Sequence, residues 1–252
     1  MKSKKLTFKG AHGDTLSAKL DLPDCNNPDA FVLFAHCFTC SKNLNVVGNI
    51  ARALTEKNMA VFRFDFTGLG ESEGDFSDTN FSSNIDDLIK AAEYMEAEFQ
   101  APDILVGHSL GGAAVLMAAH KVSSCKAVAT IAAPSSPDHV KKNFKPKLDE
   151  IEEKGQAQVT LAGRSFNIKK QFLDDLNQPN MDKMIKELDR ALLIFHSPLD
   201  NTVGIENAGH IFKQAKHPKS FISLDKADHL LSSEKDSIYV GTMLATWAYT
   251  YI

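Results

Sequence analysis

The feature that most constrains the fold of this chain is the short stretch 107–112, whose residues are Gly-His-Ser-Leu-Gly-Gly. It stands between an apolar run and a segment of small residues, which indicates a strand followed by a helix. A tight turn between the two needs small residues two places before and after its centre, and Gly107 and Gly111 meet that need. The side chain of Ser109 is then exposed at the start of the helix, where the helix dipole favours negative charge. In isolation the serine would more simply cap a helix. In this setting the stretch predicts a nucleophile on a strand-to-helix turn.

The rest of the chain alternates short β-branched and aromatic runs with longer segments of helical period. This order is typical of a mostly parallel central sheet with helices on both faces, an α/β fold. We expect an opening hairpin over 5–9 and 15–22, and strands over 31–36, 60–66, 103–108, 127–134, 191–197 and 220–225. Helices are expected over 43–58, 82–99, 109–122, 203–215 and 237–250. A length of 252 residues and a hydrophobic content of 43% suit a single domain, 1–252, with a sheet buried on both faces.

The alternation fails over residues 135–190, which we interpret as a small inserted cap. Residues 147–153 are predicted to form a polar helix that ends at Gly155. A short hairpin is predicted around the turn 162–164, followed by a helix that carries Phe172, Leu173 and Leu176.

A serine hydroxyl is a weak nucleophile, so it needs a nearby base and a carboxylate that orients the base. Asp200 follows the strand at 191–197, and His229 follows the strand at 220–225. Because parallel strands end at the same edge of a sheet, both should converge on Ser109. The sequence therefore predicts a triad of Ser109, His229 and Asp200. Asp228 is the rival acid, but a residue adjacent to the histidine usually points away from it.

The oxyanion of a tetrahedral intermediate would need two backbone N–H donors. The residue after the nucleophile supplies one, Leu110, and the loop after the first buried strand should supply the other, for which we choose Phe38. His36 and His108 flank these positions and are predicted to shape the substrate site. The glycine-rich stretch 65–74 fits no nucleotide-binding pattern and is expected to be a turn that supports the floor of the site.

The serine turn, the stretch 63–74 and the Asp200 and His229 motifs resemble the α/β-hydrolase superfamily of esterases, lipases and acyl-peptidases over almost the whole chain. More narrowly, 34–42 and 216–220 resemble the hydrolase module that in bacteria is fused to an OsmC-type peroxiredoxin domain. The resemblance implies an α/β-hydrolase fold, a carboxylesterase-like activity without a cofactor, and a functional link to such a peroxiredoxin. The chain departs from the superfamily at Cys37 and Cys40, where the common loop has glycines.

The predicted cap follows strand ends where substrates bind in this kind of sheet. Its aromatic residues Phe166 and Phe172 are expected to contact an acyl group, and Arg164 could meet a carboxylate or phosphate or make a surface salt bridge. The expected substrate is a small acyl ester or thioester rather than a long lipid.

Three alternatives remain open. Cys37 and Cys40 have the spacing of a thiol-disulfide oxidoreductase, although packing of two soft side chains in the loop is the interpretation we favour. The triad could instead serve a cofactor-free perhydrolase, with peroxide as the acyl acceptor, or the scaffold could merely bind a ligand. A metal site built from His36, Cys37 and Cys40 lacks an evident fourth ligand, so no metal is expected.

The net charge of -4 with interspersed lysines and acids gives no basic stripe for nucleic acid and no polybasic membrane anchor. The expected partner is therefore a small molecule, and the sequence leaves the oligomeric state open.

No apolar run approaches membrane-spanning length, and no signal peptide follows the basic residues at the start. Four cysteines in a chain this long do not form a disulfide scaffold, so a cytoplasmic location is expected.

Overall fold

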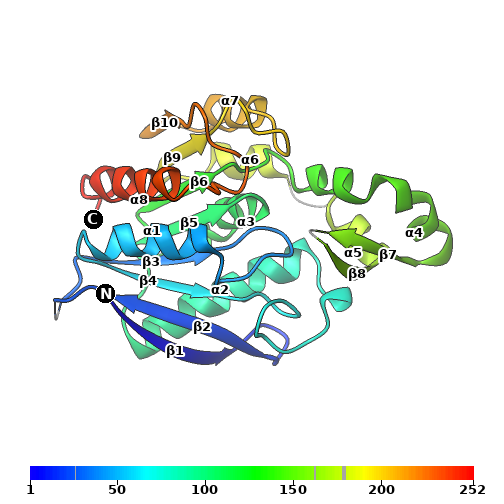
Figure 1. Ribbon diagram of the computed structural model, residues 1–252, viewed down its shortest axis with the longest axis horizontal. Coiled ribbons are helices and arrows are strands. Elements are labelled where there is room, and N and C mark those ends of the chain that lie inside the picture. Colours follow the sequence, from blue (N-terminus) through cyan, green and yellow to red (C-terminus); the bar gives the residue numbers. More distant parts are fainter. Residues whose placement is uncertain (26, 162, 178–179) are drawn as a thin grey trace.

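The computed structural model describes residues 1–25, 27–161, 163–177 and 180–252. Its centre is an eight-stranded sheet in the order β1-β2-β4-β3-β5-β6-β9-β10 (Figure 1). In the antiparallel part of this sheet, β1 (Lys2–Lys9) pairs with β2 (Thr15–Leu22), and β2 pairs with β4 (Met59–Phe64). The parallel part comprises β3 (Ala30–Ala35), β5 (Ile104–His108), β6 (Ala127–Ile131), β9 (Ala191–His196) and β10 (Lys219–Ser223), together with β4.

Helices cover both faces of the sheet, so the predicted α/β-hydrolase fold is confirmed. One face carries α1 (Asn45–Thr55) and α8 (Glu234–Ala248), which pack on each other and on the sheet. The other carries α2 (Phe81–Glu98), α3 (Leu110–Ala118), α6 (Met181–Lys186) and α7 (Glu206–Gln214). Within the described residues, no helix has both the length and the apolar character needed to cross a bilayer.

The central strands are apolar throughout because both of their faces are buried. In β3, Val32 and Phe34 face the layer of α1 and α8, whereas Leu33 and Ala35 face the opposite core. This alternation divides the core in two and explains why such strands are continuous hydrophobic runs in the sequence.

The element ends differ from the predicted ones by a few residues. The strand predicted over 127–134 ends at Ile131, because Ala132 has a φ of 51° and cannot continue an extended strand. The helix predicted over 109–122 ends at Ala118, and the first strand begins earlier, at Lys2. These shifts leave the order of elements unchanged.

The direction in which successive parallel strands are added to the sheet reverses at β3. The chain runs from β3 to β4 on one side and returns to β5 on the other side, so the carboxyl ends of β3 and β5 are neighbours at the switch point. Ligands bind at such a point in open α/β sheets. The loop after β3 holds Phe38, and the turn after β5 holds Ser109.

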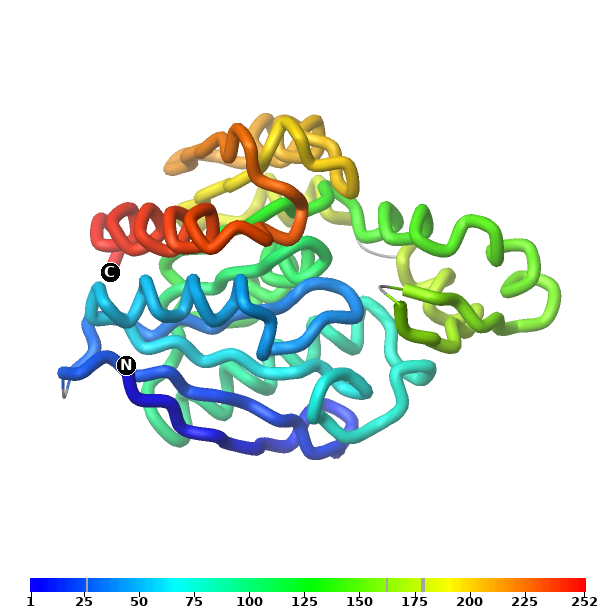
Figure 2. Tube along the Cα trace, viewed as in Figure 1, coloured from blue at the N-terminus to red at the C-terminus, as the bar shows by residue number. Residues whose placement is uncertain are grey.

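The segment between β6 and β9 projects from the end of the sheet (Figures 1 and 2). It contains 3-10 turns over Pro137–Lys147, α4 (Leu148–Lys154), the hairpin of β7 (Gln156–Leu161) and β8 (Arg164–Lys169), and α5 (Lys170–Asp175). The polar helix ends at Gly155, whose φ is 78°, and the hairpin has the predicted place. Its turn residue Ala162 lies outside the described residues. The final helix of the segment, α6, does not project, because its apolar side, with Met181 and Ile185, packs on α3.

Candidate active site

The structure brings the three residues of the predicted triad together at the carboxyl edge of the sheet. Ser109 follows β5, Asp200 follows β9, and His229 lies between β10 and α8. His229 Nε2 is 3.0 Å from Ser109 Oγ, and His229 Nδ1 is 2.8 Å from Asp200 Oδ2. The imidazole can therefore receive the serine proton on one nitrogen while its other N–H donates to the carboxylate.

The turn at Ser109 depends on close backbone packing. Ser109 has a φ of 54°, a left-handed conformation that a residue with a side chain rarely adopts. A Cβ at Gly107 would lie 2.2 Å from the carbonyl oxygen of Gly111, and one at Gly111 would lie 2.5 Å from that of Ala35. Both positions therefore require glycine, as the sequence pattern predicted, and their contacts hold the serine in its strained conformation.

Asp200 is buried, and both of its carboxylate oxygens accept hydrogen bonds. Besides the bond to His229, its Oδ1 accepts the backbone N–H groups of Thr202 and Val203, each at 2.9 Å. Burial alone would raise the pKa of this carboxyl group. The hydrogen bonds from His229, Val203 and Thr202 outweigh burial, so the pKa of Asp200 lies below its ordinary value. Asp200 is thus held as a carboxylate that can orient and charge-balance the histidine.

The rival acid, Asp228, has a different task. It is exposed, and its Oδ1 accepts the backbone N–H of Ser232 at 2.8 Å, which closes the loop after His229. Since Asp200 is the carboxylate in contact with the ring, the geometry favours Asp200 for the orienting role.

Two fully buried histidines support the triad from behind. His108 Nε2–H donates to the carbonyl oxygen of His229 at 2.8 Å, and the two rings lie 5.4 Å apart. His196 Nε2–H donates to the carbonyl oxygen of Val203 at 2.7 Å, beside Asp200. His196 is not among the predicted site residues, although its place at the end of the strand before Asp200 is a usable signal. His108, expected to shape the substrate site, does not line the cleft that opens over Ser109 and instead fixes the backbone of His229.

Burial favours the neutral form of both supporting histidines. Burial, with a smaller effect of His229, lowers the pKa of His108 to about 4. Burial likewise lowers the pKa of His196. Because a neutral ring does not offset the negative charge of Asp200, that charge acts on the imidazole of His229, which the carboxylate contacts.

The predicted oxyanion donors, Phe38 and Leu110, lie on the two segments that meet at the switch point. Across the described chain, no protein acceptor takes the backbone N–H of either residue. Both N–H groups are therefore available to a negative oxygen.

The loop that carries Phe38 is closed by a disulfide between Cys37 and Cys40, whose Cα atoms are 5.3 Å apart. The sequence pattern favours two soft side chains packed in the loop, whereas the structure joins them in a disulfide. A turn this tight brings two cysteines three residues apart within bonding distance, whereas their spacing alone does not specify their oxidation state. Over the described ranges no group of histidine, cysteine and acidic side chains is arranged to hold a metal ion.

The far end of this loop is anchored by a buried ion pair that the sequence analysis missed. Lys42 Nζ lies 2.6 Å from Asp65 Oδ2 and 2.7 Å from Glu71 Oε2, and the backbone N–H of Lys42 donates to Asp65 Oδ1 at 2.6 Å. Asp65 begins the glycine-rich stretch 65–74. That stretch therefore supports the loop, in line with its predicted role as the floor of the site.

A cleft of about 710 Å³ opens over Ser109 and His229. Its wall includes the disulfide loop, and the projecting segment contributes Thr160, Leu161 and Arg164. Of the five side chains predicted to contact substrate, Arg164 lines this cleft. Phe166 and Phe172 lie behind the wall, where they pack against Phe76 and, for Phe172, also against Phe38.

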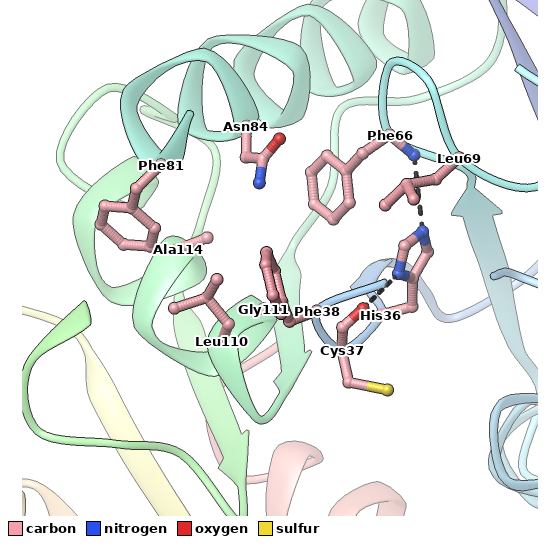
Figure 3. A pocket seen from close by; sticks show the side chains of 10 residues that line it. All are labelled: His36, Cys37, Phe38, Phe66, Leu69, Phe81, Asn84, Leu110, Gly111 and Ala114. Carbon is pink, nitrogen blue, oxygen red and sulfur yellow. Dashed lines mark hydrogen bonds between the residues drawn. The ribbon is translucent and has the colours of Figure 1, made fainter. Parts of the chain in front are cut away.

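His36, the remaining predicted contact, is buried beneath the loop. Its Nδ1–H donates to the carbonyl oxygen of Cys37 at 2.8 Å, and burial lowers its pKa. Figure 3 shows it beside a small cavity of about 10 Å³, into which the amide of Asn84 also points. Such a volume holds about one water molecule and no substrate, so His36 supports the loop rather than the ligand.

Comparison with known proteins places these features in a wider group. The profile of the family described as serine aminopeptidase, S33, matches residues 26–160. The esterase domain from a Rhodothermus marinus protein is 50% identical, with a TM-score of 0.83 over 100% of this chain and 99% of that chain. Ferulic-acid-bound Est1E from Butyrivibrio proteoclasticus has a similar fold, at 19% identity and a TM-score of 0.80 over 97% and 99% of the two chains. The uncharacterized protein YfhR of Salmonella typhimurium is 22% identical over 248 residues, 96% of this chain and 80% of that protein.

The two acids can be distinguished by substitution. We predict that Asp200→Asn lowers kcat for an ester by about 10⁴-fold, because an amide stabilises the wrong histidine tautomer and cannot balance the imidazolium charge. Asp228→Asn is the matched control and should stay within about tenfold of wild type, since it keeps an acceptor for Ser232. A larger loss in Asp228→Asn than in Asp200→Asn would show that the wrong acid has been chosen.

His108 should make the stability of the fold depend on pH. Its pKa falls from an ordinary value of 6.5 to about 4 on folding, so the unfolded chain binds its proton first as the pH is lowered. The contribution of neutral His108 to the free energy of unfolding is about 3 kcal/mol. It is fully present above pH 6.5 and is lost by about pH 4. We predict that His108→Gln, which keeps a donor near His229, reduces the pH dependence of the unfolding free energy over this range, while the buried His36 and His196 keep their own contributions. Urea unfolding at several pH values measures it, and an unchanged slope would refute the assignment.

Proposed function

Because the chain belongs to the serine aminopeptidase S33 family of α/β hydrolases, we propose that it is a serine hydrolase of the carboxylesterase type. It cleaves small acyl esters or thioesters through an acyl-enzyme. The observation that carries this proposal is the unbroken series of hydrogen bonds from Ser109 Oγ through His229 to Asp200.

In the first half of the reaction, Ser109 Oγ attacks the carbonyl carbon of the ester while His229 Nε2 takes the hydroxyl proton. Asp200 stabilises the imidazolium ion that results. The carbonyl oxygen becomes an oxyanion between the N–H groups of Phe38 and Leu110, and each donor typically contributes about 3 kcal/mol to the transition state. Collapse of the intermediate breaks the bond to the alcohol or thiol, which leaves with the proton from His229.

In the second half, a water molecule attacks the acyl carbon on Ser109 and gives its proton to His229. The new tetrahedral intermediate uses the same two N–H donors, and its collapse releases the acid and returns the proton to Ser109 Oγ. Hydrogen peroxide could replace water as the acyl acceptor in this step and would give a peracid with the same residues.

The preference for small acyl groups rests on the packing behind the cleft. The rings of Phe38, Phe76 and Phe172 contact one another with centroids 5.6 to 6.5 Å apart, so they fill the space beyond the disulfide loop. A long acyl chain would have to displace these rings, which costs packing energy in a well-filled core. A functional link to an OsmC-type peroxiredoxin remains part of the proposal, on the resemblance of 34–42 and 216–220.

Thiol-disulfide exchange is the second candidate function, because the Cys37–Cys40 disulfide lines the same cleft. It would need no triad, whereas the triad geometry is complete. The two functions therefore predict opposite results when either set of residues is removed.

One experiment separates the two candidate functions. Wild type, Ser109→Ala and the double variant Cys37→Ser, Cys40→Ser are treated with a fluorophosphonate probe and assayed with p-nitrophenyl butyrate. We predict that Ser109→Ala loses labelling and at least about a thousandfold in turnover, because the probe and the ester both need the activated oxygen. The cysteine variant should keep labelling and change turnover by about tenfold or less, through a looser oxyanion loop.

Labelling that persists in Ser109→Ala would refute the serine assignment. Loss of all hydrolysis in the cysteine variant, with a measurable dithiol couple in wild type, would favour the redox function. Circular dichroism of each variant checks that the fold is intact.

A further inference from the structure

The cleft over Ser109 has an uneven charge. Among the described residues that line it, Arg164 carries a fixed charge, while the neutral polar groups come from serine, threonine and asparagine side chains. The carboxylate closest to the reaction, Asp200, is buried behind His229 and does not line the cleft. A substrate in this cleft therefore meets a positive centre with no opposing charge among the described residues of the cleft wall.

Arg164 is held in place by neutral partners. It begins β8, and its guanidinium donates to the carbonyl oxygen of Thr39 in the disulfide loop. Its guanidinium carbon also lies 5.2 Å from the centre of the Phe166 ring. Both contacts orient the planar group and leave its charge uncompensated.

Two of the other three arginines are paired with carboxylates, whereas the Arg190 guanidinium donates to the carbonyl oxygen of Asp189. Arg63 is paired with Asp21, and Arg52 with Glu234. Within the described residues, no carboxylate lies within 4.0 Å of the Arg164 guanidinium. The surface salt bridge that the sequence left open for Arg164 is therefore not formed among the described residues.

We propose that Arg164 binds a carboxylate group carried by the ester substrate, so that the enzyme prefers anionic esters over neutral ones. This inference rests on the proposed function and names its substrate class. A guanidinium has five N–H donors, and those not used by Thr39 suit the two oxygens of a carboxylate. A phosphate dianion would keep one negative charge unbalanced by this cation, which is why a carboxylate fits better.

Two pairs of esters test the proposal, each pair differing by one charge. The acyl-side pair is the p-nitrophenyl monoester of glutaric acid and its methyl ester. The alcohol-side pair is meta-acetoxybenzoate and its methyl ester. The quantity measured is the ratio of kcat/KM for the charged ester to that for its neutral partner, which cancels any general effect of a variant on the loop.

We predict a ratio above one for wild type in at least one pair, falling about tenfold or more in Arg164→Gln. Arg164→Lys should keep part of the ratio, since it keeps the charge but not the planar fork. The control is Lys169→Gln, which removes a positive charge from the same strand, where Lys169 pairs with Asp78 outside the cleft, and should keep the full ratio. Because Arg164 is exposed, the wild-type ratio should also shrink when salt is raised.

Two results would overturn the proposal. Turnover of the neutral esters with a ratio of one or below in both pairs would refute the role of Arg164 and leave the proposed hydrolase intact. An elevated ratio that survives in Arg164→Gln would also refute it. If wild type hydrolyses none of the four esters, the proposed function itself fails and this inference fails with it.

Discussion

The close packing of the turn at Ser109 against the first buried strand is the constraint on which the rest of the site depends. A Cβ at Gly111 would lie 2.5 Å from the carbonyl oxygens of both Ala35 and His36, so the helix start and the loop after β3 approach as closely as backbones can. This contact sets the distance between the N–H groups of Leu110 and Phe38. It also holds the left-handed backbone that lifts the serine out of the sheet. One approach of two segments thus positions the nucleophile together with its proposed oxyanion donors.

The loop is then fixed from three further directions. The Cys37–Cys40 disulfide closes its start, Arg164 holds Thr39 from the projecting segment, and Asp65 anchors Lys42 at its end. Desolvation offsets much of the attraction in a buried ion pair such as Lys42–Asp65, whose short contacts fix the position of the loop end. A loop held in this way keeps its N–H donors in a fixed position. Such donors stabilise a developing negative charge well, because they need no rearrangement during the reaction.

The sequence was sufficient to predict that Ser109, Asp200 and His229 lie together, because strand order and parallel direction place all three at one edge of the sheet. It was insufficient for the supporting residues. Lys42 and Asp65 look like surface charges in the sequence, and their burial follows from how the loop folds back on the glycine-rich turn. Phe166 and Phe172 were expected to contact substrate, yet they pack behind the wall of the cleft. The alternation of apolar residues in a sequence does not tell which side of a small hairpin faces a cleft. The disulfide depends on oxidation state, which no spacing encodes.

Detection of the acyl-enzyme tests the central claim most directly. Wild type is mixed with p-nitrophenyl butyrate, quenched in acid during turnover, digested and examined by peptide mass spectrometry. We predict a butyryl group on the peptide that contains Ser109, absent from Ser109→Ala, because attack by Ser109 Oγ forms a covalent ester before water enters. Steady hydrolysis with a butyryl group on a different residue, or with single-turnover kinetics that exclude any covalent intermediate, would contradict it.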